Sequence, residues 1–109
     1  MKKSKFLTVK IKGVDWKIYA QATSTYHRLH GRDSHAITYT KEHEIFFKLS
    51  ELSPEYVRHE LMHAYVMCCS INSSSLTADQ MEEVCAEIFG EHGAEMFLMV
   101  DQILNFFLR

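Results

Sequence analysis

The stretch of residues 57–71 constrains the fold most, because it is long, mostly apolar and free of glycine and proline. Ser53-Pro54-Glu55 precedes it and is typical of a helix start, with a serine for the N-cap, a proline for the first helical position and an acid for the first turn. Apolar residues then recur at helical spacing, at Val57, Leu61, Ala64 and Cys68. We therefore predict a largely buried helix, on which polar side chains need partners.

This helix carries His59, Glu60 and His63 in the pattern His-Glu-x-x-His. Residues four apart lie on one helix face, so His59 and His63 can direct two imidazoles at one metal ion. Glu60 lies about 100° round the helix from His59, where its carboxylate can reach a metal-bound water. The chain has 7 histidines, so chance can also produce this pattern. The helical context favours a zinc peptidase site, which needs two nitrogen ligands, an open position and a base.

The size and composition of the chain indicate one globular domain that spans residues 1–109. A chain of 109 residues can form one modest core but not two. Its 47% hydrophobic and 24% charged residues are globular values. A net charge of -2 gives no reason to expect a nucleic-acid partner.

The sequence also predicts a cytoplasmic protein. The odd number of cysteines follows no disulfide framework, which favours reduced thiols in a reducing compartment. Lys5, Lys10 and Lys12 interrupt the segment that would be the apolar region of a signal peptide, so we expect no such peptide. No apolar run reaches the roughly 18 residues of a spanning helix, so we expect no membrane partner.

The N-terminal half is predicted to form a small antiparallel or mixed sheet of about three to four strands. Residues 6–11 and 16–22 alternate between apolar and polar side chains, and Gly13-Val14-Asp15 marks a turn between them. These two runs therefore predict a hairpin. Residues 23–35 are polar and fit either a short helix or a loop.

Residues 36–40 and 44–49 favour two further short strands, because they are rich in β-branched and aromatic side chains. The second run leads directly into the histidine-bearing helix. It can therefore be an edge strand beside the metal, to which an extended peptide adds through main-chain hydrogen bonds. An ordinary strand of the sheet explains the same pattern equally well, and the two interpretations are compatible.

The C-terminal third is predicted to be helical and completes an α+β fold. Thr77 begins a helix with Gln80 as its capping-box partner, and Gly90 and Gly93 mark a break or kink. Residues 94–108 form a last, unusually apolar helix. We favour packing of this helix against the sheet and the histidine-bearing helix. The alternative is a surface for self-association or for a partner protein.

A catalytic zinc usually has three protein ligands, so the two histidines need a third. The metzincin arrangement would place a glycine at Val66 and a histidine at Cys69. If the helix continues, Cys69 lies about 280° round from His59, and we reject that arrangement. The second predicted helix instead offers three acids, Glu82, Glu83 and Glu87. Helical spacing also allows a plain solvent-exposed stripe, formed by Gln80, Glu83, Glu87 and Glu91.

The His-Glu-x-x-His pattern followed by these acids resembles the gluzincins, the thermolysin-like zinc metallopeptidases, over roughly residues 58–87. The resemblance implies His59, His63 and Glu83 as zinc ligands and Glu60 as the general base. It also implies that Glu87 holds the first ligand histidine through its second ring nitrogen. The rest of the chain is similar, more loosely, to short phage- and prophage-type metallopeptidases of minimal zincin-like fold.

The resemblance implies a zinc-dependent endopeptidase with a peptide or protein substrate. Glu60 would take a proton from the attacking water and later deliver it to the leaving amine. A further donor usually stabilises the oxyanion of the reaction. The candidates by residue type are Tyr65 and His92, and also Tyr39, His43 and Arg58.

Two other functions stay open at this stage. The domain can hold zinc without catalysis, as a structural or partner-binding module, in which case the metal should have a closed, water-excluded shell. Alternatively it is a regulatory protein that stays latent until its cleft is uncovered. Prophage metallopeptidases that cleave repressors suggest this second function by analogy.

Overall fold

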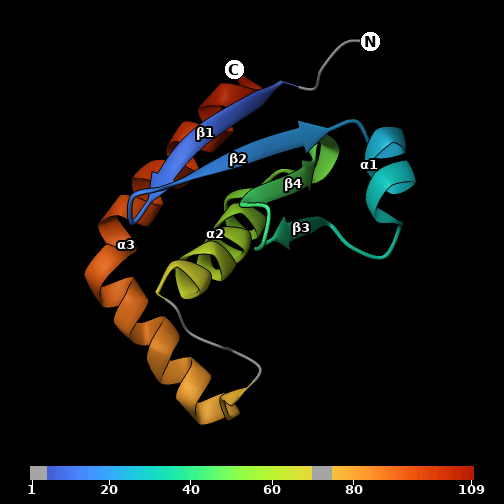
Figure 1. Ribbon diagram of the computed structural model, residues 1–109. Coiled ribbons are helices and arrows are strands. Elements are labelled where there is room, and N and C mark those ends of the chain that lie inside the picture. Colours follow the sequence, from blue (N-terminus) through green and yellow to red (C-terminus); the bar gives the residue numbers. More distant parts are fainter. Residues whose placement is uncertain (1–4, 70–74) are drawn as a thin grey trace.

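The computed structural model describes residues 5–69 and 75–109 and has one four-stranded sheet (Figure 1). The elements in chain order are β1 (Phe6–Ile11), β2 (Val14–Gln21), α1 (Thr23–His30), β3 (Ala36–Tyr39), β4 (Glu44–Lys48), a 3₁₀ turn (Leu49–Glu51), α2 (Pro54–Cys68) and α3 (Ala78–Leu108). The strand order is β1-β2-β4-β3, in which β2 and β4 are parallel and the other pairs are antiparallel. The predicted α+β fold with a small mixed sheet is confirmed.

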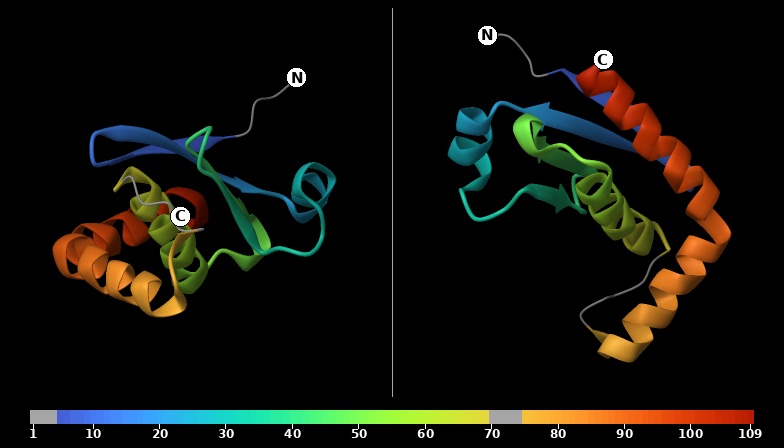
Figure 2. Two further views of the ribbon diagram at one scale, coloured as in Figure 1. Left: turned by 60° about the horizontal axis from the view of Figure 1, so that its bottom comes forward. Right: turned by 180° about the vertical axis from the view of Figure 1, so that it is seen from behind.

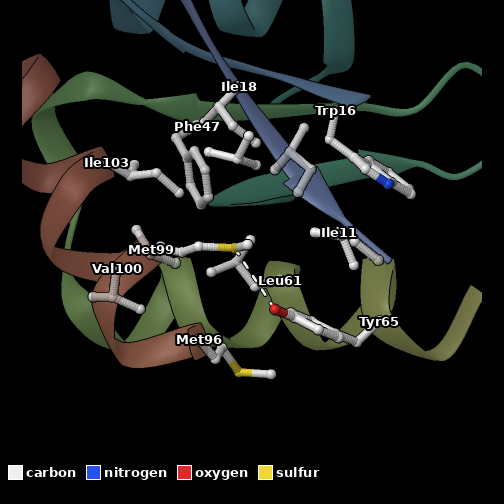
Figure 3. Close-up of a cluster of buried hydrophobic side chains, with 14 of the residues drawn as sticks. Ile11, Trp16, Ile18, Phe47, Leu61, Tyr65, Met96, Met99, Val100 and Ile103 are labelled. Atoms are coloured by element: carbon white, nitrogen blue, oxygen red, sulfur yellow. Dashed lines mark hydrogen bonds between the residues drawn. The ribbon is translucent and has the colours of Figure 1, made fainter. Parts of the chain in front are cut away.

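The core lies between the sheet and the two long helices. Figure 2 shows α2 and α3 together on one face of the sheet. The strands direct their alternate apolar side chains to this face, namely Val9, Ile11, Trp16, Ile18, Ile45 and Phe47. Figure 3 shows how Leu61 of α2 and Met99 of α3 meet these side chains. Of the apolar stripe predicted on the histidine-bearing helix, Val57, Leu61 and Ala64 are buried, as expected, and Cys68 is half-buried.

The predicted hairpin of β1 and β2 is confirmed, with Val9 opposite Trp16. Its turn lies at Lys12 and Gly13, slightly earlier than expected, and both residues have positive φ angles of 49° and 82°. Such angles suit the two-residue turns that follow the twist of a hairpin. Val14 consequently pairs with Ile11 as part of β2 instead of lying in the turn.

Of the two interpretations of residues 44–49, the structure supports the ordinary strand of the sheet. β4 lies between β2 and β3 and is therefore not an edge strand, and β3 is the edge strand next to it. The polar segment after β2 forms α1, and the chain then returns so that β4 pairs in parallel with β2. Among the described residues, no strand pairs with the outer side of β3, and β3 also contacts α2.

The predicted starts of both long helices are confirmed. The side chain of Ser53 accepts a hydrogen bond from the main-chain N–H of Tyr56 at 3.3 Å, which caps α2. Thr77 and Gln80 form the predicted capping box at the start of α3. α2 ends at Cys68, and residues 70–71 of the predicted helix lie outside the described residues.

Of the predicted break or kink at Gly90 and Gly93, the structure has no break, because α3 is one helix of 31 residues, which agrees with the expectation of one or two C-terminal helices. Each glycine in a helix costs about 1 kcal/mol relative to alanine. Burial of flanking side chains such as Ile88 and Met96 offsets this cost. Phe89 packs its ring over Gly93, the buried one of the two glycines. Figure 1 shows that α3 bends about midway along its length without breaking.

One face of α3 packs in the core, which confirms the favoured interpretation of its apolar residues. Other large apolar side chains of α3 stay exposed, namely Phe89, Phe97, Leu98 and Leu108. A role of these residues in self-association or partner binding stays a prediction. Among the described residues, no helix combines the length and apolar character needed to cross a membrane.

Candidate metal centre

The centre of α2 brings His59, Glu60 and His63 together beside β3. The cap at Ser53 and the proline that follows fix where α2 begins, and the buried stripe around Leu61 fixes how it is rotated. His59 and His63 lie on the exposed side of the helix. Glu60 lies between the exposed and the packed sides, and the residue is only 7% exposed.

The two imidazoles are arranged as ligands of one shared ion. The Nε2 atoms of His59 and His63 are 3.3 Å apart, and the two rings are inclined at 77°. Tetrahedral zinc with Zn–N bonds of roughly 2.0–2.1 Å separates two nitrogen ligands by about 3.3 Å. The donor pair therefore fits a tetrahedral metal as it stands.

Glu60 completes a group that can hold a metal ion. Its Oε2 atom lies 3.8 Å from Nε2 of His59, while its Oε1 atom accepts a 2.7 Å hydrogen bond from the hydroxyl of Thr38. The potential ligand atoms of His59, Glu60 and His63 all lie within 4.8 Å of one another. Two imidazoles and a carboxylate suit a divalent transition metal, with no one metal specified by the set alone.

The group opens to a cavity that solvent can enter. A space of about 330 Å³ is lined by the three side chains and by Ala36, Ile37, Thr38 and Thr40. A second hollow of about 380 Å³ shares His59 and Glu60 and extends towards His35 and Tyr56. The side chain of His59 is 68% exposed. A molecule approaching along β3 can thus reach the histidine pair.

The outer edge of β3, with which no described strand pairs, borders this cavity. The N–H of Lys48 donates to the carbonyl of His35, so these two residues form a hydrogen-bonded pair of the antiparallel ladder. Such pairs alternate with pairs that direct their main-chain groups away from the partner strand. Ala36 and Thr38 therefore present their N–H and C=O groups at the open edge, and both line the cavity.

The structure does not bring Glu83 or Glu87 to the histidines. Both are exposed on the first turns of α3, and neither belongs to the group around His59. The first turns of α3 project away from the sheet (Figure 1), and the buried residues of the helix begin at Ile88. Because α3 is one continuous helix, its start follows the direction set by its packed C-terminal half.

The two favoured candidates for the oxyanion donor lie elsewhere. Tyr65 is fully buried, and its hydroxyl donates to Oε1 of Glu95 on α3 at 2.7 Å. His92 packs its ring against that of Tyr65, with centroids 5.2 Å apart. Neither residue lines the cavity. Tyr65 lies about 200° round the helix from His63, and His92 packs beside Tyr65.

The weaker candidates for the oxyanion donor are also absent from the cavity wall. The hydroxyl of Tyr39 is hydrogen-bonded to Nδ1 of His30, and His43 packs against Trp16. Arg58 lies on α2 but does not line the cavity. Thr38 is the site residue that the sequence did not reveal, since its contact with Glu60 depends on how β3 is placed beside α2.

Comparisons with known proteins found no family model, no curated protein and no solved structure that matches this chain. The resemblance to the gluzincins therefore rests on the residues of this chain alone. Of the site residues that the resemblance implies, the structure gathers His59, Glu60 and His63 and leaves the two acids of α3 apart.

Proposed function

We propose that the protein is a zinc-dependent metallopeptidase that hydrolyses peptide bonds at His59, Glu60 and His63. One observation carries the proposal: two Nε2 atoms 3.3 Å apart lie beside a shielded carboxylate in an open cavity. Zinc bound there would lower the pKa of a water ligand and polarise the substrate carbonyl. The combination of a metal-holding pair, a nearby base and solvent access is what such hydrolysis needs.

The residues of the chain have separate roles in this proposal. His59 and His63 hold the metal through Nε2, which leaves each Nδ1 free to donate a hydrogen bond. Glu60 accepts the proton of the attacking water and passes it to the leaving amine. The resemblance assigns the third ligand position to Glu83 and a supporting role to Glu87. This assignment has the least support, because both acids are exposed on α3.

The free edge of β3 suggests how a substrate binds. An extended peptide can pair with the main-chain groups of Ala36 and Thr38. These two residues line the same cavity as the two histidines. Main-chain pairing accepts many sequences, so we expect side-chain specificity to come from the hollow near His35 and Tyr56. The substrate class is therefore an unfolded or flexible peptide segment.

A purely structural zinc site is the alternative, and the exposure of the ligands argues against it. Structural zinc sites are closed by four protein ligands. Here the side chain of His59 is 68% exposed and borders two hollows. An inactive zinc-binding or latent regulatory protein would nevertheless keep the metal and lack turnover.

The test is a peptide-library cleavage screen with zinc-loaded protein and its Glu60→Gln variant. We expect cleavage by the wild type, and loss of turnover with retained zinc in the variant, because the amide cannot accept the proton. An Asp101→Asn variant, which changes an exposed acid of α3, is the matched control. Equal turnover in wild type and Glu60→Gln would contradict the role of Glu60. Absence of any cleavage by zinc-loaded wild type would favour the alternative.

A further inference from the structure

We propose that Thr38 is a positioning residue that fixes the carboxylate of Glu60 towards the histidine pair. This inference rests on the proposed function, because it concerns the base of the same reaction. The Thr38 hydroxyl donates to Oε1 of Glu60 at 2.7 Å and lies 3.4 Å from the main-chain carbonyl oxygen of Glu60. The two residues are far apart in sequence and meet only because β3 lies beside α2.

The hydrogen bond distinguishes the two oxygens of the carboxylate. Oε1 is occupied by the Thr38 hydroxyl, whereas Oε2 lies 3.8 Å from Nε2 of His59. Oε2 is thus the oxygen that faces the metal position and can accept the proton. The side chain of Glu60 is only 9% exposed. Its carboxylate therefore needs a hydrogen-bond donor, because burying a charged group without one costs free energy.

The same residue links the base to the substrate. The main chain of Thr38 faces the open edge of β3, while its side chain reaches Glu60. A peptide that pairs with this edge would hold Thr38, and with it the hydroxyl, in place. Substrate pairing and the orientation of the proton-accepting oxygen are therefore coupled through one residue.

The test compares a variant without the hydroxyl with one that keeps it. Thr38→Val removes the hydroxyl at nearly constant volume, and Thr38→Ser retains it. A hydrogen bond to a charged group corresponds to a rate change of roughly 10- to 100-fold. We expect Thr38→Val to lower kcat by about this factor, with KM and bound zinc unchanged and with kcat restored in Thr38→Ser.

Two controls separate positioning from a general effect on folding. Thr8→Val makes the same change on β1, the opposite edge strand, where the threonine is exposed. It should leave kcat unchanged. If Thr38→Val does not fold, Thr38→Ala supplies a second variant without the hydroxyl. Crystal structures of the zinc-loaded variants give a readout besides activity: Glu60 should turn away from His59 in the hydroxyl-free variants and keep its place in Thr38→Ser.

The possible outcomes distinguish this inference from the proposed function. Wild-type turnover together with an unchanged kcat in Thr38→Val, or an unmoved Glu60 in its crystal structure, overturns the role of Thr38 alone. A fall in bound zinc or a rise in KM without a change in kcat also overturns it, since positioning acts on the base. Lack of turnover in the wild type overturns the proposed function and the role of Thr38 together.

Discussion

The hydroxyl of Tyr65 on α2 donates a 2.7 Å hydrogen bond to Oε1 of Glu95 on α3. The same hydroxyl lies 3.8 Å from the sulfur of Met99, and Figure 3 marks this contact with a dashed line. Tyr65 is on the side of α2 opposite the two histidines. The bond therefore ties α2 to α3 and helps to set the rotation at which α2 presents His59 and His63.

Removing this bond should destabilise the protein without disturbing His59 and His63. We expect Tyr65→Phe to lower the free energy of unfolding by about 1 kcal/mol, measured by urea denaturation. Tyr56→Phe is the control, because the hydroxyl of Tyr56 makes no hydrogen bond within the described residues. Equal stability of Tyr65→Phe and the wild type would mean that the bond adds nothing to the association of α2 with α3.

The stability of the protein should fall in alkaline solution. Burial, and next the hydrogen bond with Glu95, raises the pKa of Tyr65 above its ordinary value of 10.0. A folded-state pKa above the unfolded one adds stability below pH 10.0 that is lost as the pH rises further. Urea denaturation at a series of pH values above 10 should show a smaller loss in Tyr65→Phe. Identical pH profiles would contradict this prediction.

Replacement by alanine should have opposite effects on stability at Gly90 of α3 and at Gly13 of the hairpin. A Cβ atom at Gly90 would meet nothing within 4 Å, and the residue lies inside a helix. Gly90→Ala should therefore stabilise the protein by about 0.5–1 kcal/mol. Gly13→Ala should destabilise it, because Gly13 has a φ of +82°. Thermal denaturation of both variants provides the measurement. Destabilisation by Gly90→Ala would indicate that α3 is broken there after all.

The assignment of Glu83 as third ligand can be tested against its neighbour. If Glu83 binds the metal, Glu83→Ala should lose zinc under mild chelation, because two imidazoles alone hold it more weakly. Glu82→Ala changes an adjacent exposed acid of α3 and should keep its zinc. Elemental mass spectrometry after dialysis measures both. Equal retention of zinc in the two variants would exclude Glu83 as a ligand. It would also agree with the separation of Glu83 from the two histidines in the structure.

Local features of this fold could be predicted from the sequence. The α2 helix follows from the Ser53 cap and an uninterrupted apolar stripe, and the meeting of His59 with His63 follows from helix geometry alone. The hairpin of β1 and β2 likewise depends on neighbours in sequence. In each case the interacting residues are close along the chain, so periodicity and turn chemistry are sufficient.

Features that depend on distant contacts could not be predicted. Which strand forms the edge depends on the parallel pairing of β4 with β2, which no local pattern encodes. The continuity of α3 depends on burial of Ile88 and Met96 against other elements, which outweighs the local cost of two glycines. The contact of Thr38 with Glu60 follows from the edge position of β3 and was missed for the same reason.

Zinc content is the most direct test of the candidate metal centre formed by His59, Glu60 and His63. The amount per chain should be measured by elemental mass spectrometry in wild type, His63→Ala and His27→Ala, after exposure to zinc and mild chelation. His27 lies on α1, outside the group around His59, so the His27→Ala variant serves as the matched control. We expect equimolar zinc in the wild type and in His27→Ala, and loss of zinc in His63→Ala. A folded wild type that takes up no zinc would contradict it.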